Sequence, residues 1–358
     1  MTRHAPRILF RADASPSLGG GHVMRCLALA RALCNPVSHE WGTNVAFACC
    51  EGTLDAAPAL ARANLPVTTA RSEADFDFPA DWNGRADAIF VDLYTSTRAD
   101  ETRMRDRAGL IAVIEDLPER THDCDLLVDP MPGGSPFDYA GRVPGDCNIM
   151  AGGAFALVRS EFADQRQRAL DRHVNPGPVK RVLVSMGLTD LGGISEPVAR
   201  LALDTLPEAS VEVILGPRAP SRAALEALCR TEPRLTVHID IDDMAQRMAK
   251  ADLAIGAGGG TALERCVVGL PSIAVVLAGN QQEMTGLLDT DGALAAIASP
   301  EDVLAELPGL IRRLERPAAR ARMAERAAAV CDGRGAQRVA QALVERIERQ
   351  REAGHEPV

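Results

Sequence analysis

Short apolar segments, each followed by a helical pattern, are the feature that most constrains how this chain folds. In the first half they occupy residues 7–12, 45–49, 88–92 and 110–115, and in the second half residues 181–185, 211–215, 235–239, 251–255 and 272–277. Strands buried on both faces have continuous apolar sequences, and strands that alternate with helices form parallel sheets. The two series therefore predict two doubly wound α/β domains.

A polar stretch that contains Pro and Gly, DRHVNPGPVK, separates the two series at residues 171–180. We therefore predict an N-terminal domain at 1–170, a linker at 171–180, a second domain at 181–335, and a C-terminal helix and tail at 336–358. The buried stripe of that last helix is expected to consist of Val339, Leu343, Val344 and Ile347. Ligands bind at the carboxyl ends of strands in open α/β sheets, so we expect an interdomain cleft.

Composition and charge narrow the class of function. The 358 residues are 46% hydrophobic and 25% charged, which is ordinary for a soluble protein. The net charge of −10 argues against a nucleic-acid-binding surface, although backbone dipoles can still bind a phosphate ligand. We expect no membrane span, no secretory signal and a cytoplasmic location. The nine cysteines form no CxxC pair and the histidines do not cluster with acids, so neither a disulfide framework nor a metal site is predicted.

The first candidate site follows the first predicted strand, between Arg11 and Arg25. Three glycines at 19–21 allow a tight turn and a close approach of backbone to a ligand. His22 then begins the predicted helix, where the helix dipole disfavours a charged imidazole. A neutral imidazole can accept a proton from water, so His22 is our candidate base. The alternative is that His22 only caps the helix.

Each of the other polar residues in these motifs has both a functional and a structural interpretation. Asp13 either orients His22 or binds sugar hydroxyls, unless it caps a loop. Arg25 contacts the substrate or a phosphate, or it packs against the sheet or at the surface. Tyr94, after the predicted strand 88–92, lies in the cleft or packs under a loop. Further substrate contacts are expected from Arg11, Gly20 and Gly21.

The second candidate site is the glycine-rich sequence GAGGGTALERC at 256–266, which again joins a strand to a helix. Free backbone N–H groups there suit a diphosphate, and the Thr261 hydroxyl would add a donor. Glu264, one turn into the helix, is placed to accept hydrogen bonds from ribose hydroxyls. The spacing does not fit a dinucleotide-binding GxGxxG motif. Gly259 and Gly260 would contact the ligand, and Asn280 and Gln281 either do the same or form a turn.

Together these motifs resemble the pseudaminic-acid-pathway family of sugar-nucleotide hydrolases over most of the chain. The most specific part runs from Arg11 to Leu27, and it contains Gly21-His22-Val-Met-Arg25. The further matches are Asp92-x-Tyr94, Ile114-Glu-Asp116, Cys124-Asp125, the run from Gly153 to Phe162, the run from Ala251 to Gly259, Glu264-Arg265-Cys266, Gly269-Leu-Pro271 and Asn280-Gln281.

The resemblance implies a GT-B-like fold of two Rossmann-like domains and hydrolysis of a UDP-linked diacetamido-trideoxy sugar. Water would attack the anomeric carbon with inversion, His22 would act as base, and Tyr94 would position water or substrate. The loop of the second domain would hold UDP, with Glu264 on the ribose. No cofactor, metal, nucleic-acid or membrane partner is implied, and a monomer is expected.

Four departures from the family pattern bear on the sugar. The sequence Gly187-Leu-Thr-Asp190 replaces a Gly-Gly-Thr-Asp turn, in which Gly187 remains a predicted substrate contact. Gly260 replaces a serine, Leu263 replaces an aromatic residue, and Asp129-Pro-Met131 replaces an Asn/Gln-rich stretch.

Two alternatives of other kinds remain open. A GT-B glycosyltransferase similar to the lipid-II-forming UDP-GlcNAc transferase would share the nucleotide loop. It should also show an apolar or basic patch for a membrane-bound acceptor. A non-catalytic sugar-nucleotide sensor would not need His22 or Tyr94. Release of UDP without an acceptor would distinguish hydrolysis from both.

Overall fold

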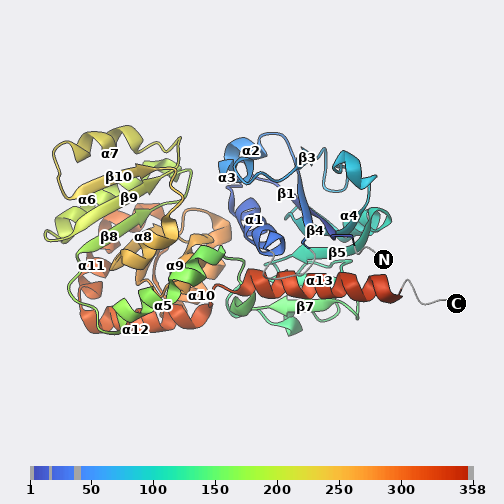
Figure 1. Ribbon diagram of the computed structural model, residues 1–358. Helices are drawn as coiled ribbons and strands as arrows, with labels where there is room; N and C mark the ends of the chain where they lie inside the picture. Colours follow the sequence, from blue (N-terminus) through green and yellow to red (C-terminus); the bar gives the residue numbers. More distant parts are fainter. Residues whose placement is uncertain (1–3, 16–17, 36–41, 354–358) are drawn as a thin grey trace. The chain divides into compact units, whose positions relative to one another are not determined.

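The computed structural model describes residues 4–15, 18–35 and 42–353, which form two compact units. Unit 1 comprises Met1–Arg159 and Arg334–Val358, and unit 2 comprises Ser160–Gly333. Each unit is a parallel sheet with helices on its faces (Figure 1). The chain therefore builds most of unit 1, then all of unit 2, and returns to unit 1 with its last helix.

Unit 1 has a seven-stranded parallel sheet with the strand order β3-β2-β1-β4-β5-β6-β7. Its strands are β1 (Arg7–Ala12), β2 (Asn44–Cys49), β3 (Val67–Thr69), β4 (Ala86–Asp92), β5 (Ala108–Ile114), β6 (Leu126–Asp129) and β7 (Asn148–Ala151). The predicted strands at 7–12, 45–49, 88–92 and 110–115 correspond to β1, β2, β4 and β5.

Successive residues of the unit 1 strands face opposite layers of helices. Phe10 lies in the core cluster that also contains the apolar side chains of α1 (Gly21–Cys34) and α13 (Gly335–Ala353). The Phe10 ring stacks on Phe47 and Phe90, with ring centroids 5.1 Å and 5.4 Å away. Leu9 belongs to the cluster on the other face, with Met104 of α4 (Arg98–Met104). This alternation on a fully buried sheet explains why β1 is apolar almost throughout.

The remaining helical segments of unit 1 are short. They are α2 (Thr53–Ala56), α3 (Pro58–Ala61), η1 (Ala80–Trp82), α4 (Arg98–Met104), η2 (Arg105–Arg107), η3 (Pro136–Tyr139) and η4 (Gly153–Phe155). The predicted stripe of the last helix is confirmed, because Val339, Leu343, Val344 and Ile347 are all buried in the core cluster with α1.

Unit 2 has a six-stranded parallel sheet with the order β10-β9-β8-β11-β12-β13. Its strands are β8 (Arg181–Ser185), β9 (Ser210–Leu215), β10 (Leu235–Ile239), β11 (Leu253–Ala257), β12 (Ser272–Val275) and β13 (Ala295–Ile297). Its helices are α5 (Ser160–Val174), η5 (Leu191–Gly193), α6 (Ser195–Thr205), α7 (Arg222–Cys229), α8 (Met244–Lys250), α9 (Thr261–Val267), η6 (Gly279–Gln281), α10 (Gln282–Thr290), η7 (Pro300–Asp302), α11 (Val303–Leu314) and α12 (Pro317–Val330).

The core of unit 2 joins one face of its sheet to α6, α7 and α11. On these strands the buried residues are mainly valine, isoleucine and leucine, for example Val184, Val213 and Ile255. Helices α5 and α8 pack on each other, as do α9 and α12. Both faces of the sheet are thus covered, as the continuous apolar strands predict.

The observed division differs from the predicted boundaries in two places. Residues 171–174 of the predicted linker belong to α5, which is part of unit 2 rather than of the N-terminal domain. Phe162 and Ala169 anchor this helix by their burial, so the polar sequence at its end does not mark the boundary. The predicted segment 336–358 belongs to unit 1 up to the last described residue, and 354–358 lie outside the described residues.

Each sheet has one point where the strand order reverses. In unit 1 it lies between β1 and β4, where Ala12 pairs with Asp92. In unit 2 it lies between β8 and β11, where Ser185 pairs with Gly256. Loops that leave two adjacent strands in opposite directions open a crevice, and ligands of doubly wound sheets bind there. The two sequence-predicted sites both follow strands of these pairs.

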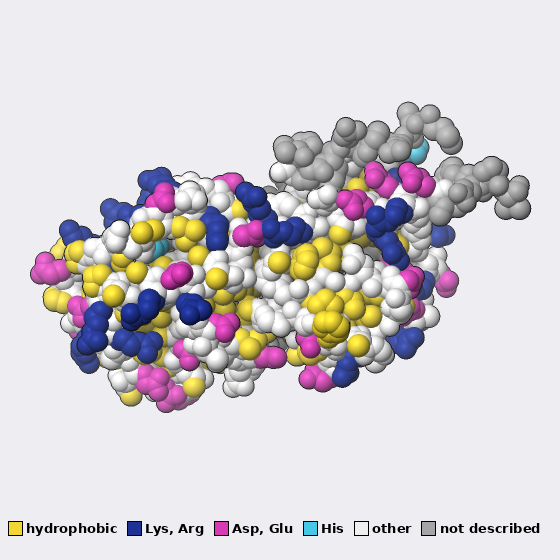
Figure 2. Space-filling model, turned by 90° about the horizontal axis from the view of Figure 1, so that it is seen from below, with side chains coloured by type: hydrophobic (Ala, Val, Ile, Leu, Met, Phe, Trp, Pro, Cys, Tyr) yellow, Lys and Arg dark blue, Asp and Glu magenta, His cyan; other side chains and the backbone are white. Residues whose placement is uncertain are grey.

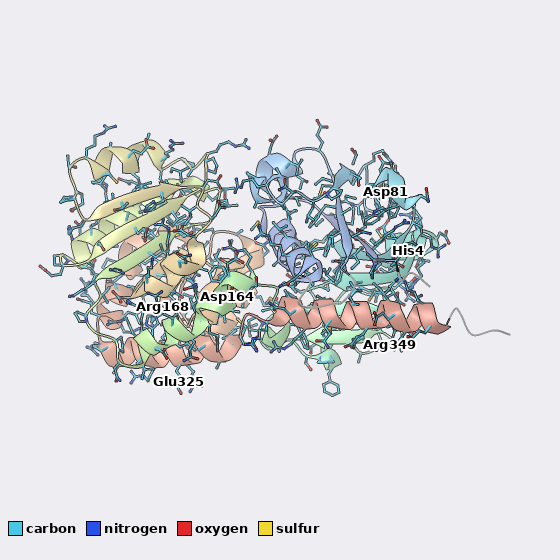
Figure 3. All side chains as sticks on the ribbon, viewed as in Figure 1. His4, Asp81, Asp164, Arg168, Glu325 and Arg349 are labelled. Atoms are coloured by element: carbon cyan, nitrogen blue, oxygen red, sulfur yellow. The ribbon has the colours of Figure 1, made fainter. Side chains whose placement is uncertain are left out.

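Charged side chains are distributed over the exterior of both units. Asp164 and Arg168 on α5 and Arg349 on α13 are exposed (Figure 3). On the face drawn in Figure 2, acidic and basic side chains are interspersed with apolar ones. This mixture is typical of a solvated surface.

Candidate functional site

Helix α1 presents His22 at the reversal point of unit 1. The turn before it uses Gly19 with φ of +78°, a conformation that favours glycine. Gly20 is the N-cap residue and provides no side chain to cap the helix, and Gly21 is the first helical residue. His22 is therefore in the first turn of α1, and only 5% of its surface is exposed.

The His22 ring is held by a carboxylate from the neighbouring strand. Its Nδ1 lies 2.6 Å from Oδ1 of Asp92, the last residue of β4. With Nδ1–H donated to Asp92, the neutral ring carries its lone pair on Nε2. The His22 side chain thus contacts a strand 70 residues away rather than the helix terminus, which favours the functional interpretation of His22 over the capping one.

Arg25 ties this carboxylate to a second one. Its Nε and one terminal nitrogen donate to the two oxygens of Asp92 at 2.7 Å and 2.6 Å, a bidentate arrangement. Its other terminal nitrogen donates to Asp116 at 2.7 Å. The guanidinium is mostly buried, so Arg25 fixes the geometry around His22 instead of projecting toward solvent.

Tyr94 completes the cluster at the carboxyl end of β4. Its ring meets the His22 ring edge to face, with centroids 4.6 Å apart and an interplanar angle of 88°. Its hydroxyl donates to Asp116 at 3.2 Å. Tyr94 therefore lies beside the candidate base. We call the group His22, Arg25, Asp92, Tyr94 and Asp116 the His22 cluster.

The His22 cluster places one guanidinium between two carboxylates. Burial favours a neutral Asp92, but Arg25 and His22 together hold the pKa of this carboxyl well below its usual range. Burial and the charge of Asp116 raise the pKa of the Tyr94 phenol, so the phenol stays protonated and acts as a donor at neutral pH. Asp92 is thus a permanent anion that can orient His22 and stabilise the charge it gains as a base.

The structure corrects two predictions from the first strand end. Asp13 does not hold His22, because its Oδ1 accepts from the Cys50 backbone N–H at 2.7 Å and pairs with Arg11 at 2.8 Å. Arg11 was expected to contact the substrate, but it is 1% exposed and donates to the Ser72 carbonyl and Cys50 Sγ. Both side chains instead anchor the loop that follows β2.

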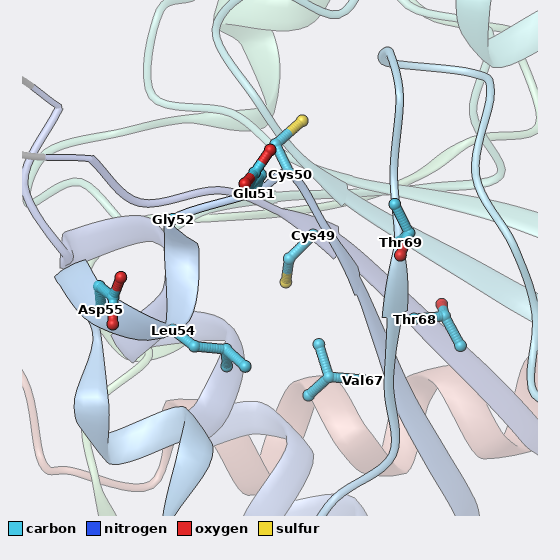
Figure 4. Close-up of a pocket in the computed structure, with 9 residues that line it drawn as sticks. All are labelled: Cys49, Cys50, Glu51, Gly52, Leu54, Asp55, Val67, Thr68 and Thr69. Carbon is cyan, nitrogen blue, oxygen red and sulfur yellow. The ribbon is translucent and has the colours of Figure 1, made fainter.

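That loop forms one wall of a cavity of about 490 Å³ in unit 1. Figure 4 shows Cys49 and Val67 at the strand ends and Leu54 from α2 around it, with Glu51 and Asp55 nearby. The residues that line this cavity do not include His22, so the cavity and the best-organised chemical group of unit 1 are different places.

The glycine-rich loop of unit 2 is packed closely against the start of α10. A Cβ on Gly258 would lie 2.2 Å from Thr285 Oγ1, which donates to the Gly258 carbonyl at 3.2 Å. Gly259 is half-buried and Gly260 is exposed, and Thr261 begins α9. Gly258 is therefore fixed in the interior, whereas Gly260 is open to solvent.

The polar residues after β12 have different environments. Gln281 accepts from the Leu277 backbone N–H at 3.0 Å through Oε1 and lies against Gly258 and Gly259. Gln281 thus supports the turn, one of its two predicted roles. Asn280 is exposed within η6. Glu264 is 9% exposed in the first turn of α9.

The loop after β8 has an unusual backbone. Gly187, Gly192 and Gly193 have φ of +80°, +70° and +70°, and Asp190 adopts φ of +46°. The buried Asp190 carboxylate accepts from the backbone N–H groups of Ser195 and Ser221 at 2.9 Å and 3.0 Å. These contacts offset the backbone strain of Asp190 in its left-handed conformation. They also fix the loop that carries Gly187, which lies beside the strand that leads into the glycine-rich loop.

Sequence reasoning missed Asp92 and Asp116 as parts of the site. It recognised both within motifs but gave the orienting role to Asp13, which is nearer to His22 in sequence. The available signal was that the run 88–92 ends in Asp92 and that Asp116 directly follows the run 110–115. Carboxyl ends of parallel strands meet at one edge, so these acids could have been placed beside the His22 loop.

The described residues lack two kinds of feature. No helix within residues 4–15, 18–35 and 42–353 is long and apolar enough to cross a membrane. In the same part of the chain no group of three or more His, Cys, Asp and Glu side chains could hold a metal ion.

Comparisons with known proteins give a partial family match. The glycosyltransferase family 28 C-terminal domain matches residues 199–342, which include the glycine-rich loop. UDP-2,4-diacetamido-2,4,6-trideoxy-β-L-altropyranose hydrolase of Campylobacter jejuni is 24% identical over 254 residues, 70% of this chain and 84% of that protein. UDP-N-acetylglucosamine–N-acetylmuramyl-(pentapeptide) pyrophosphoryl-undecaprenol N-acetylglucosamine transferase of Sorangium cellulosum is 38% identical over 111 residues, 29% of this chain and 27% of that protein.

Among solved structures, MurG of Acinetobacter baumannii is similar, with a TM-score of 0.62 and 17% identity. The likeness covers 95% of this chain and 99% of the MurG chain. With the parallel sheets of units 1 and 2, it establishes the predicted fold class, two Rossmann-like α/β units of the GT-B type. A shared fold does not define an activity, so the function rests on the site residues.

Proposed function

We propose that this protein hydrolyses a UDP-linked amino sugar, with a UDP-diacetamido-trideoxy sugar as the specific substrate. The His22–Asp92 pair is the observation that carries the proposal. A buried anion occupies Nδ1 and leaves Nε2 of the neutral ring as the proton acceptor. The pair lies where the strand order of unit 1 reverses, at the sheet edge that ligands use in this class of fold.

In the proposed reaction, Nε2 of His22 takes a proton from water as the water oxygen bonds to the anomeric carbon. The bond between that carbon and the diphosphate oxygen breaks, and its electron pair leaves with UDP. A single displacement of this kind inverts the anomeric centre. Asp92 stabilises the imidazolium that forms, and Tyr94 positions water or sugar beside the ring.

The nucleotide is assigned to unit 2. Backbone N–H groups of Gly259 and Gly260 and the Thr261 hydroxyl would bind the diphosphate, and Glu264 would accept from the ribose hydroxyls. Gly187 and Asn280 are assigned to the rim of the same site, which Gln281 supports. A productive complex requires the His22 cluster and this loop to reach one substrate molecule.

Two of the comparisons support the choice of substrate. The relative that covers most of this chain is named for hydrolysis of a UDP-linked diacetamido-trideoxy sugar. The matched family 28 C-terminal domain includes the glycine-rich loop and Glu264. The His22–Asp92 pair supports a proton-accepting role at this site, and the named hydrolase supports the choice of water as the attacking group.

The test is a release assay with a small panel of UDP-amino sugars, with no acceptor added. We expect steady, multiple-turnover formation of UDP and free sugar from at least one diacetamido-trideoxy substrate, and slower release from UDP-GlcNAc. A purified, folded protein that binds these nucleotides but releases no UDP would contradict hydrolysis.

Glycosyl transfer is the second candidate function. The family 28 domain match and the short alignment to the Sorangium transferase favour it. The same His22–Asp92 pair would then remove a proton from an acceptor hydroxyl instead of from water. Release of UDP that depends strictly on an added acceptor would support transfer over hydrolysis.

A further inference from the structure

A buried arginine lies at the reversal point of unit 2, next to the glycine-rich loop. Arg265, on α9, is 1% exposed. Its terminal nitrogen donates to the carbonyl of Ala257, the last residue of β11, at 2.8 Å. Its Nε has no hydrogen-bond partner among the described residues, and no carboxylate there forms an ion pair with it. A guanidinium with five N–H donors is thus held by one neutral acceptor.

The surrounding backbone is shaped to admit this charge. A Cβ on Gly256 would lie 2.5 Å from the Arg265 guanidinium and 2.8 Å from the Ser185 carbonyl oxygen. Gly256 pairs with Ser185 across β11 and β8. The guanidinium therefore lies beneath the ends of both strands, from which the Gly187 loop and the glycine-rich loop continue. Only glycine at 256 leaves room for it there.

A buried guanidinium charge destabilises the folded protein unless hydrogen-bond acceptors or negative charges compensate it. Burial lowers the pKa of Arg265 to about 10, and this still leaves the side chain protonated at neutral pH. Other buried arginines of the chain are better compensated. Arg25 has two carboxylates. Arg320 donates to three carbonyls, those of Leu314, Glu315 and Gly177, although its Nε also has no hydrogen-bond partner among the described residues. Arg265 stands out because a single carbonyl compensates it within the described residues.

We propose that Arg265 is a positioning residue whose buried charge makes the unit 2 site selective for the diphosphate group of the nucleotide. This inference rests on the proposed function, because it assumes that the glycine-rich loop binds UDP. Arg265 does not touch the ligand. It acts through the potential it creates at the loop above it, where a low-dielectric interior transmits charge more strongly than water does. A ligand with more negative charge should therefore gain more binding free energy from Arg265.

The prediction is a charge-dependent loss of affinity. Replacing Arg265 by glutamine keeps a donor near the Ala257 carbonyl and removes the charge. We expect Arg265→Gln to weaken UDP binding by about 10- to 100-fold, to weaken UMP less, and to leave uridine nearly unchanged. The readouts are calorimetric dissociation constants for UDP and competition measurements for UMP and uridine. Arg265→Met is measured in parallel as a second neutral variant, with circular dichroism and thermal unfolding to confirm the fold.

Arg320→Gln is the matched control, because it removes a fully buried arginine of the same unit without altering the nucleotide loop. It should bind all three ligands as the wild type does. A folded Arg265 variant that binds UDP within twofold of wild type, or loses UDP and uridine affinity equally, would overturn the inference. Failure of the wild-type protein to bind UDP would instead contradict the proposed function itself, so the two failures are distinguishable.

Discussion

The two reversal points of the molecule carry charge in opposite ways. In unit 1, Arg25 pairs with both Asp92 and Asp116 at 2.6–2.7 Å beside His22, and Oδ1 of Asp116 has no hydrogen-bond partner among the described residues. In unit 2, the loop offers backbone groups and glycines, and the buried Arg265 has no carboxylate partner among the described residues. The same sheet topology thus carries an ion-pair cluster in one unit and a buried arginine beside a glycine-rich loop in the other.

This difference indicates a division of labour. A pre-organised cluster suits proton transfer, because its charges do not need to rearrange when a reaction occurs. An incompletely compensated cation suits binding of an anion, because the ligand supplies what the protein lacks. We therefore assign chemistry to unit 1 and nucleotide affinity to unit 2. Variants in the two units should then affect different measured constants.

The largest effect is expected in unit 1. His22→Asn removes the base but no group assigned to the nucleotide, so kcat should fall by about 10²- to 10⁴-fold while the Kd for UDP stays within about twofold. Initial-rate kinetics and calorimetry on one preparation measure both quantities. His173→Asn is the matched control, since His173 is a buried histidine of α5 outside the site. A His22→Asn enzyme with more than half of the wild-type kcat would remove His22 from the mechanism.

In unit 2 the expected effect is on binding. Glu264→Ala should weaken UDP binding by on the order of 1.5–3 kcal/mol, because a charged hydrogen bond to the ribose is lost. The exposed Glu226→Ala on α7 should change nothing and serves as the control. Calorimetry with UDP decides the matter. An unchanged Kd for Glu264→Ala would mean that this carboxylate has only a structural role.

A smaller effect is expected on the pH dependence of stability. Two carboxylates of unit 1 have pKa values that are shifted in opposite directions. Burial raises the pKa of Asp129 to about 6, whereas Arg25 and His22 overcome burial to lower that of Asp92. Asp129 therefore contributes stability below its unfolded pKa near 4, and this is lost as pH rises through about 6. Asp92 contributes stability above its unfolded pKa, and this is lost as pH falls through its lower folded pKa.

Asp129→Asn should consequently flatten the stability profile between pH 4 and 6, by on the order of 1 kcal/mol. Urea unfolding of variant and wild type at several pH values measures this. Asp138→Asn, at an exposed aspartate of η3 in the same unit, is the comparison variant. If wild type and Asp129→Asn show the same pH dependence of the free energy of unfolding in this window, then Asp129 is not buried in its protonated form.

Removal of divalent metal should have the smallest effect. The backbone groups of the glycine-rich loop, with Arg265 beneath them, supply positive potential for the diphosphate, so we expect full turnover in EDTA. Rates before and after chelation, and after added Mg²⁺ or Mn²⁺, provide the measurement. Activity that disappears with EDTA and returns with either ion would mean that unit 2 needs a metal to hold UDP.

The sequence predicted the longer strands well because their signal is strong. β1, β8 and β10 have the predicted bounds, since five or six residues with apolar character stand between polar turns. The short strands β3 and β13 have three residues each and were not predicted. A segment of that length has no pattern of its own, and it becomes a strand because a long neighbour offers hydrogen bonds.

The candidate site was predictable in part for a related reason. His22, Tyr94 and the glycine-rich loop lie in local motifs, and local spacing reveals them. The contact between His22 and Asp92 spans 70 residues and depends on β4 lying beside β1. Arg11 shows the reverse error, because its place in a motif suggested ligand contact whereas its side chain is buried. Tertiary placement of a side chain is what sequence patterns convey least.

The most direct test of the central claim is hydrolysis of the substrate in H₂¹⁸O, followed by mass spectrometry of UDP. With His22 as base for attack at the anomeric carbon, the sugar C1–O bond breaks and the UDP oxygens all come from the substrate. UDP is the informative product, because the anomeric oxygen of a free sugar exchanges with water. We expect UDP without ¹⁸O at every stage of the reaction. Incorporation of ¹⁸O into a phosphate of UDP would show attack at phosphorus and would contradict the role assigned to His22.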